Sequence, residues 1–187
     1  MVLLHTPPGE LGSPAADFNL PGVDGHNHAL DDYRDASVLV VMFICNHCPY
    51  VRSVEPRLIQ LAREMAPAGV RMVGINSNDP TNYPDDSFEN MKKRAEEKGY
   101  TFDYLCDEDQ SVARAYGAIC TPDFYIYDQQ RKLRYRGRLD DSPRNPLMVK
   151  SQDLKAAIQA ILEGQPVAER QHSSMGCSIK WKGTPPG

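Results

Sequence analysis

The sequence has no long hydrophobic run and no block of like charge. Its 187 residues include 21 Lys or Arg and 25 Asp or Glu, which gives a net charge of −4. The longest apolar stretch is about eight residues, whereas a membrane-spanning helix needs about 20. A surface that binds nucleic acid or an acidic membrane is rich in positive charge, and this chain has no such excess. We therefore expect neither nucleic acid nor a membrane as a partner.

A secretory signal is also lacking, because residues 1–16 contain no basic segment followed by an apolar one. We therefore expect a cytoplasmic protein. Cysteine is scarce: the chain has five, an odd number that is too small for a disulfide-stabilised scaffold. Apolar residues make up 41% and charged residues 25%, as in an ordinary globular protein. The length fits one domain, with room for a modest extension.

Two of the cysteines form the motif CNHC, residues 45–48, which Pro49 follows at once. Residues 37–44 are almost all apolar or β-branched, as in a strand buried on both faces. Pro49 suits the first turn of a helix, where an N–H is not needed. The two thiols therefore lie where a central strand meets a helix N-terminus, whose free amides and dipole lower the pKa of a thiol. At this spacing they can form a disulfide and reopen it by exchange.

The remaining hydrophobic pattern alternates between helical and strand periods, and turn signals predict a short hairpin within residues 17–30. The predicted strands are 38–44, 71–76, 102–105, 124–127 and 132–138, and the predicted helices are 50–65, 88–99, 110–116 and 152–162. This order indicates an α/β fold with a central mixed β-sheet, helices on both faces, and an antiparallel hairpin and helix at the end. Right-handed crossovers place the CNHC motif at the carboxyl edge of the sheet, where such folds have their sites.

A CxxC after a buried strand, with Thr121-Pro122 before a later strand and hairpin, resembles the thioredoxin-like superfamily. Within it, the chain is similar to the redoxin group, which is AhpC/TSA-like and TlpA/ResA-like. The string CNHCPYV at residues 45–51 and the string GCSIKW at 176–181 resemble a cytoplasmic bacterial subgroup of thioredoxin family proteins. The resemblance covers a domain of residues 12–164, and a C-terminal tail of residues 165–187 matches separately.

The resemblance implies thiol–disulfide exchange on a disulfide-containing protein or a small thiol. Cys45, expected to be the more exposed thiol at the helix N-terminus, would attack, and Cys48 would resolve the mixed disulfide. Thr121 and Pro122 would be joined by a cis bond that faces the dithiol. No organic cofactor and no metal are implied, because the electrons come from a dithiol protein or a reductase.

His47 lies directly before the second cysteine, where a partly charged imidazole would favour the Cys45 thiolate and stabilise the dithiol. We therefore predict a reduction potential above that of a reducing thioredoxin, which is about −270 mV. The resemblance has a gap, because thioredoxins bury an aspartate where this chain has Leu39. His47, Glu55 or water would then have to accept the proton.

Three other functions are compatible with the motif. The first is a thiol peroxidase, but peroxiredoxins have a P-x-x-x-[ST]-x-x-C loop that fits neither Cys45 nor Cys48, although Arg136 or Arg138 could still approach. The second is a zinc or copper(I) site that uses the CxxC, His47 and Cys177, although adjacent residues 47 and 48 do not easily bind one tetrahedral ion. The third is a non-catalytic module in which the disulfide switches a partner surface.

The other cysteines and the acidic loop after residue 76 leave further choices open. We expect Cys106 to be a small buried hydrophobe. Cys120 precedes Thr121 and either packs or forms an alternative disulfide, and Cys177 either docks near the site or only packs. The acidic residues of the loop 78–86 lack the spacing of a calcium-binding loop, so we expect a solvated connection.

Overall fold

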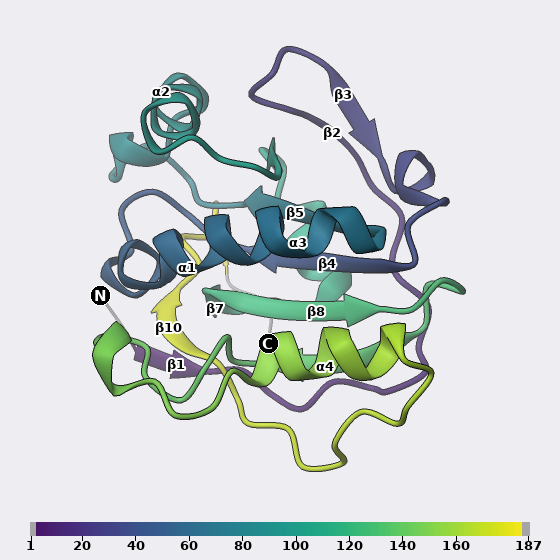
Figure 1. Cartoon of the computed structure of the whole chain (residues 1–187). Coiled ribbons are helices and arrows are strands. Elements are labelled where there is room, and N and C mark those ends of the chain that lie inside the picture. Colours follow the sequence, from purple (N-terminus) through teal and green to yellow (C-terminus); the bar gives the residue numbers. More distant parts are fainter. Residues whose placement is uncertain (1–2, 185–187) are drawn as a thin grey trace.

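The structure, a computed structural model, describes residues 3–184. At its centre is a five-stranded sheet in the order β6-β5-β4-β8-β9 (Figure 1). The first three of these strands are parallel to one another, and β8 and β9 are antiparallel to their neighbours. The strands are β4 (Val38–Phe43), β5 (Val70–Asn76), β6 (Asp103–Cys106), β8 (Asp123–Tyr127) and β9 (Leu133–Gly137). The predicted mixed α/β sheet is confirmed.

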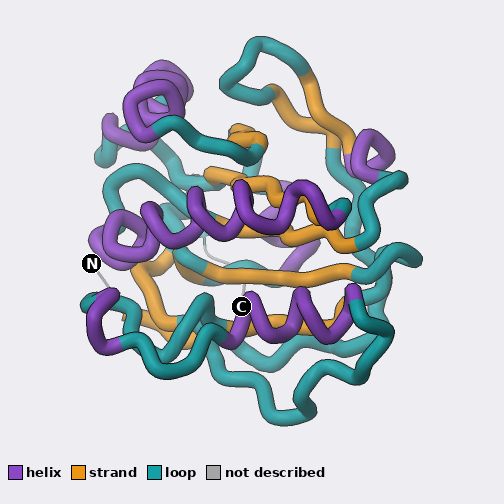
Figure 2. Tube along the Cα trace, viewed as in Figure 1, coloured by secondary structure: helices purple, strands orange, loops and turns teal. Residues whose placement is uncertain are grey.

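Helices cover both faces of the sheet, as predicted (Figures 1 and 2). The strand β4 is buried at all six positions, and its alternate side chains enter two separate cores. Val38, Val40 and Met42 pack in the core that contains α1 and α4, whereas Leu39 and Val41 pack in the core that contains α3. The helices are α1 (Pro49–Met65), α2 (Phe88–Lys98), α3 (Ser111–Tyr116) and α4 (Asp153–Leu162).

Local sequence signals set several element boundaries. The helix α1 begins at Pro49, and Cys48 is its N-cap. The helix α2 ends before Gly99, whose φ of 64° belongs to the left-handed region that glycine tolerates. Short 3-10 helices are η1 (Leu30–Tyr33), η2 (Ala66–Ala68), η3 (Pro84–Asp86) and η4 (Pro146–Met148). The predicted N-terminal hairpin is formed by β2 (Asn19–Pro21) and β3 (Asn27–Ala29).

A second, three-stranded sheet was not predicted. Its strands are β1 (Leu3–His5), β10 (Met175–Ser178) and β7 (Cys120–Thr121), in that order and antiparallel. The predicted tail, 165–187, therefore returns to the domain and lies beside the segment that contains Thr121, while its residues 185–187 lie outside the described part of the chain. The limits of the domain at 12 and 164 remain a prediction.

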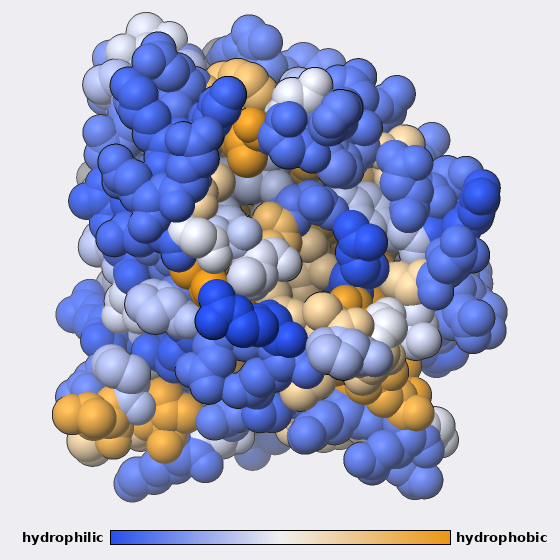
Figure 3. Space-filling model, turned by 45° about the horizontal axis from the view of Figure 1, so that its top comes forward, coloured by the Kyte–Doolittle hydropathy of each residue, from blue (hydrophilic) through white to orange (hydrophobic). Residues whose placement is uncertain are grey.

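The exposed large hydrophobic residues are Leu3, Leu11, Phe88, Leu147 and Met148 among the residues that the structure describes. The face in Figure 3 is mostly hydrophilic, with small and separate hydrophobic areas. Within residues 3–184, none of the helices combines the length and the hydropathy that crossing a membrane requires.

Candidate active site

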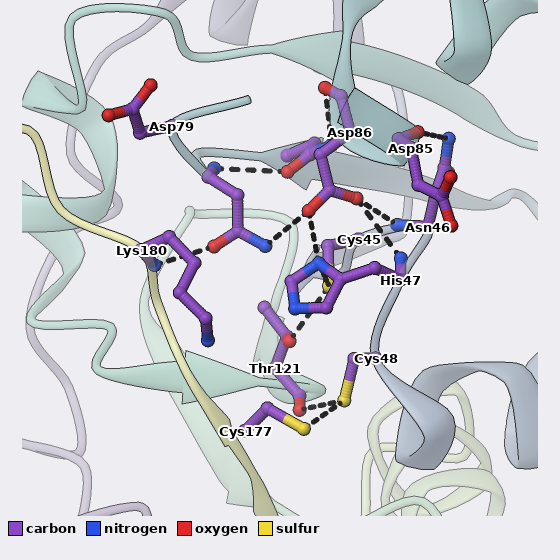
Figure 4. A network of polar contacts seen from close by, with 12 residues as sticks. Cys45, Asn46, His47, Cys48, Asp79, Asp85, Asp86, Thr121, Cys177 and Lys180 are labelled. Atoms are coloured by element: carbon purple, nitrogen blue, oxygen red, sulfur yellow. Dashed lines mark hydrogen bonds and ion pairs between the residues drawn. The ribbon is translucent and has the colours of Figure 1, made fainter. Parts of the chain in front are cut away.

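The carboxyl edge of the central sheet brings the predicted site residues together. The chain leaves β4, forms the CNHC segment and enters α1, and the cis peptide bond between Thr121 and Pro122 lies opposite (Figure 4). The Sγ atom of Cys45 lies 3.2 Å from Thr121 Oγ1, and the Sγ atom of Cys48 lies 3.2 Å from the Thr121 carbonyl oxygen, to which it can donate only while it is a thiol. Thr121 therefore contacts both sulfurs, once through its side chain and once through its backbone.

Both cysteines are buried, so the structure does not show the accessible Cys45 thiol that the sequence predicts. Cys45 is 1% exposed and Cys48 is 0% exposed. The motif is covered because two segments distant in sequence pack on it. The loop that ends at η3 contributes Asp86, which accepts hydrogen bonds from the motif's backbone, and β10 brings Cys177 against Cys48.

The negative charge of the dithiol is favoured on Cys48, not on Cys45 as the sequence predicts. Burial raises the pKa of Cys45 well above its usual value, and the hydrogen bond to Cys48 and the charge of Asp86 raise it further. The pKa of Cys48 is lowered to about 5, first by the hydrogen bond from Cys45, against the effect of burial, and then by Cys177 and the backbone of Val51. Cys48 also caps α1, where a negative charge is stabilised.

His47 is bound to a buried carboxylate that the sequence analysis treated as solvated. Its Nδ1 hydrogen-bonds Asp86 Oδ2, and the Nδ2 group of Asn78 donates to the same oxygen at 2.8 Å. The other oxygen, Oδ1, accepts the N–H groups of Asn46 at 2.7 Å and of His47 at 3.2 Å. Burial acts to raise the pKa of Asp86, but the bonds from His47 and Asn78 outweigh it, and the pKa lies below its usual value. The prediction of a solvated loop is wrong at Asp86.

The outer ring nitrogen of His47, Nε2, is buried and has no hydrogen-bond partner in the described part of the chain. The ring stacks on Tyr83, with 4.4 Å between centroids, and Lys180 Nζ lies 5.1 Å from the centre of the Tyr83 ring. Nδ1 lies 3.9 Å from Cys45 Sγ. Because Asp86 binds Nδ1, Nε2 is the ring nitrogen that the described residues leave without a partner.

Cys177 docks beside the site, which decides between the two roles considered for it. Cys177 pairs with Thr121 where β10 and β7 run antiparallel, and its Sγ lies 2.9 Å from Cys48 Sγ. The neighbouring Gly176 permits this approach, because a Cβ atom there would lie 1.9 Å from the Thr121 carbonyl oxygen. Cys120 is buried on β7, and burial raises its pKa far above the usual value. An alternative disulfide through Cys120 remains a prediction.

Glu55, one of the proton acceptors considered above, is engaged elsewhere. Its carboxylate binds the Arg94 guanidinium at 2.7 and 2.9 Å and accepts the Tyr100 hydroxyl at 2.5 Å. A carboxylate held by three donors is a structural anchor between α1 and α2. Of the two side chains considered, His47 is the one that lies beside the dithiol, with its Nδ1 3.9 Å from Cys45 Sγ.

The arginines considered for a peroxide site are also held in ion pairs. Arg136 binds the buried Asp123 at 2.9 Å, and Arg138 binds Asp153 at 2.6 Å. Each guanidinium thus has a carboxylate partner within the domain, which leaves neither poised as a ligand for peroxide beside Cys45.

The ligand atoms that could hold a metal are Cys45, His47 and Asp86, which lie within 4.8 Å of one another. This set differs from the one the sequence suggests, because Asp86 replaces Cys48 and Cys177. In the described residues, the Nδ1 that faces this cluster already bonds Asp86, so a metal would have to displace that bond. The cluster is accounted for without an ion.

A family model described as AhpC/TSA family matches residues 11–136, more than half of the chain. The chain belongs to the AhpC/TSA family. Two curated relatives are a thiol-disulfide oxidoreductase ResA from Geobacillus thermodenitrificans and a Mycobacterium tuberculosis protein named only provisionally as a peroxiredoxin. The first is 29% identical over a stretch that covers 66% of this chain and 67% of the relative. The second is 27% identical and covers 78% and 86%.

Solved structures agree with the fold. An uncharacterized conserved protein from Geobacillus kaustophilus has a TM-score of 0.94 at 51% identity and covers 99% of both chains. The thioredoxin domain of a Bacteroides vulgatus thiol-disulfide oxidoreductase has a TM-score of 0.57 at 19% identity, covering 67% of this chain and 86% of its own. The thioredoxin-like fold and the thiol–disulfide chemistry predicted for the chain are confirmed.

Proposed function

We propose that the protein exchanges disulfides with a protein or a small thiol through Cys45 and Cys48, with Cys45 attacking and Cys48 resolving. The observation that carries the proposal is the position of Cys48. Cys48 lies beside Thr121 and Cys177 and is the N-cap residue of α1. A hydrogen bond from Cys45 is the main cause that lowers its pKa to about 5. A resolving sulfur must be ionised and within reach of its partner, and Cys48 meets both requirements.

The reaction begins with a proton transfer between the two cysteines. The Cys45 thiol gives its proton to the Cys48 thiolate, and the new Cys45 thiolate attacks one sulfur of the substrate disulfide. The substrate disulfide breaks, and its first thiolate leaves with the proton held by Cys48. The Cys48 thiolate then attacks Cys45 Sγ, which forms the Cys45–Cys48 disulfide and releases the second substrate thiolate. This thiolate takes a proton from solvent.

The charge on Cys48 supports a high reduction potential for the dithiol. A stabilised thiolate favours the dithiol over the disulfide, so the pair is more oxidising than a reducing thioredoxin. The partner that restores the dithiol is a dithiol protein or a reductase. We expect a potential above about −270 mV, as we also expect from the position of His47.

The test is turnover of an insulin-type protein disulfide in the presence of a reductase or a dithiol reductant. We expect repeated turnover by the wild type and none by C45S or C48S. The matched control is C106S, because Cys106 is a half-buried cysteine at the end of β6, and it should keep full activity. Stoichiometric oxidation without turnover would support the redox-switch alternative and overturn the proposal.

A thiol peroxidase is the second candidate, favoured by the relative named as a peroxiredoxin. Both candidates use Cys45, but a peroxidase forms a sulfenic acid on it and consumes hydrogen peroxide. Consumption of peroxide that exceeds protein disulfide turnover, with a trapped sulfenic acid on Cys45, would favour this candidate.

The same assays with and without a chelator test the metal alternative, because thiol exchange should be unaffected.

A further inference from the structure

We propose that Cys177 is a third redox cysteine. Its sulfur displaces Cys45 from Cys48 and forms a Cys48–Cys177 disulfide. The inference rests on the proposed function, because it begins from the Cys45–Cys48 disulfide. It adds a second disulfide state to the site and assigns a chemical role to the C-terminal segment.

The distance between the two sulfurs is the first argument. Cys48 Sγ and Cys177 Sγ lie 2.9 Å apart, and Cys48 Sγ also lies 3.2 Å from the Thr121 carbonyl oxygen (Figure 4). A disulfide bond is about 2.05 Å long, so the sulfurs need to approach by less than about 1 Å. Cys48 thus has one cysteine partner in its own motif and another on β10.

The second argument is that β10 is fixed on both sides of Cys177. In the ladders, Cys177 lies opposite Leu3 of β1 and opposite Thr121 of β7. Before it, the Ser174 hydroxyl donates to the Pro122 carbonyl oxygen at 2.6 Å, and after it, the Ile179 N–H donates to Ile119 at 3.0 Å. The contact between the sulfurs is therefore a consequence of strand pairing.

The local sequence is adapted to this contact. Gly176 has no Cβ, and any larger residue would collide with the Thr121 backbone at 1.9 Å. The glycine lets β10 approach the segment around the cis peptide bond closely enough for the next side chain to reach Cys48. A cysteine with only a packing role would not need this approach.

The exchange needs no added oxidant. The Cys177 sulfur attacks Cys48 Sγ of the Cys45–Cys48 disulfide, the bond between Cys48 and Cys45 breaks, and Cys45 leaves as a thiolate. The proton of Cys177 passes to Cys45, so the number of electrons and protons is unchanged. The pKa of Cys177 is raised to about 12, first by burial and then by the hydrogen bond to the Cys48 thiolate. This second effect is absent once Cys48 is in a disulfide.

The result is an oxidised protein whose attacking cysteine is free again. With the disulfide stored between Cys48 and Cys177, Cys45 regains a thiol beside Thr121 and His47. It can then accept a further substrate as a mixed disulfide. The bridge also links the C-terminal segment covalently to the start of α1.

The test is disulfide mapping of C45S after incubation with oxidised glutathione. We expect a peptide pair linked through Cys48 and Cys177 and the loss of both thiols to alkylation. The matched control is C45S/C177S, in which Cys48 should remain a thiol or carry glutathione. A C45S protein that carries only a glutathione adduct on Cys48, with no internal bridge, would overturn the inference.

The variant C177S separates this inference from the proposed function. Formation of the Cys45–Cys48 disulfide in C177S, together with no internal bridge in C45S, means that only the inference fails. No Cys45–Cys48 disulfide in C177S and no turnover of a protein disulfide mean that the proposed function fails. If thermal melting shows that C45S does not fold, mapping of the wild type in glutathione buffers replaces it. Both bridges are then expected in the oxidised protein, and the Cys45–Cys48 bridge alone contradicts the inference.

Discussion

At the scale of single residues, the charge of the site depends on which sulfur receives the hydrogen bonds. Cys48 caps a helix and accepts from neighbouring thiols, whereas Cys45 is buried near the carboxylate of Asp86. The sequence motif alone predicts that one thiol is acidified but does not say which. That assignment depends on Asp86 and Cys177, which come from distant segments.

We predict that one thiolate in the reduced protein titrates at a pH of about 5. The pKa of Cys48 is lowered to this value, first by its hydrogen bond from Cys45. The measurement is the ultraviolet absorbance of the thiolate as a function of pH, in which the signal disappears as the pH falls through about 5. In C48S this transition should be absent, and in C106S it should be unchanged. A wild-type thiol that titrates only near the usual cysteine pKa, about 8.5, contradicts the charge assignment.

The carboxylate of Asp86 gives a second prediction at this scale. Its folded-state pKa is depressed, so its contribution to stability is present above its unfolded pKa, about 3.9, and is lost as the pH falls through the folded value. We expect D86N to lower the free energy of unfolding by about 1–3 kcal/mol at neutral pH. The difference from the wild type should shrink below a pH of about 4.

Denaturant unfolding at several pH values measures this effect. The matched control is D85N, because Asp85 is the exposed neighbour and pairs only with a half-exposed Arg52. Exposed pairs contribute about 0–1 kcal/mol, so D85N should differ little from the wild type. Equal effects of the two substitutions would mean that the burial of Asp86 has no energetic role.

The predicted strand order could have indicated that the loop containing Asp86 lies near the CNHC segment. The strands β4 and β5 are parallel, so the residues after β5 must lie beside the CNHC segment that follows β4. Asn76 and Asn78 are at this edge of the sheet, and Asn78 holds Asp86. The pattern could not decide which of the acidic residues in the loop turns inward, because a loop has no periodicity.

At the scale of elements, segments with a clear local pattern were predictable, and the short strands of the second sheet were not. The predicted strand 38–44 corresponds to β4, and the predicted helix 50–65 corresponds to α1, each within one residue at either end. The strands β1 and β10 were missed, because they have three and four residues and owe their conformation to pairing across the whole chain. No local pattern encodes such a partner.

The approach of β10 to β7 predicts the effect of G176A. The added methyl group would lie 1.9 Å from the Thr121 carbonyl oxygen, so the strand has to shift. We expect a loss of about 1–3 kcal/mol in the free energy of unfolding, as for other overpacked sites, and slower formation of the Cys48–Cys177 bridge. Thermal melting and disulfide mapping measure the two effects. S178A, on the same strand, is the control, and an equal response of both variants contradicts the role of Gly176.

At the scale of the whole molecule, a buried ion pair anchors the strand that follows the cis peptide bond. Asp123 directly follows Pro122 and is buried with its partner Arg136, 2.9 Å away. Burial raises the pKa of Asp123, and the charge and hydrogen bond of Arg136 act against this rise. The pair joins β8 to β9 below the cis peptide bond.

We predict that R136A lowers the free energy of unfolding by about 3–5 kcal/mol, because it leaves a buried carboxylate without its counter-ion. Chemical denaturation measures the change. R34A is the control, because Arg34 forms an exposed pair with Asp31 that should contribute about 0–1 kcal/mol. A loss for R136A no larger than that for R34A would show that the pair is not a structural anchor.

Fold class, the order of elements and the location of the site followed from the sequence, because hydrophobic period and the CxxC motif are local signals. The segments that cover the site could not be predicted from the sequence. The contact of Cys177 with Cys48 joins residues 129 positions apart, and that of His47 with Asp86 joins residues 39 positions apart. Only the folded chain brings these groups together.

The central claim is that Cys45 and Cys48 form a reversible disulfide in an oxidising site. The most direct test equilibrates the protein in glutathione buffers of graded potential, quenches it with acid and maps the cysteine pairs by mass spectrometry. The account predicts a Cys45–Cys48 disulfide that forms and reopens reversibly, with a midpoint above about −270 mV. Glutathione adducts without this disulfide, or a midpoint at or below that value, would contradict it.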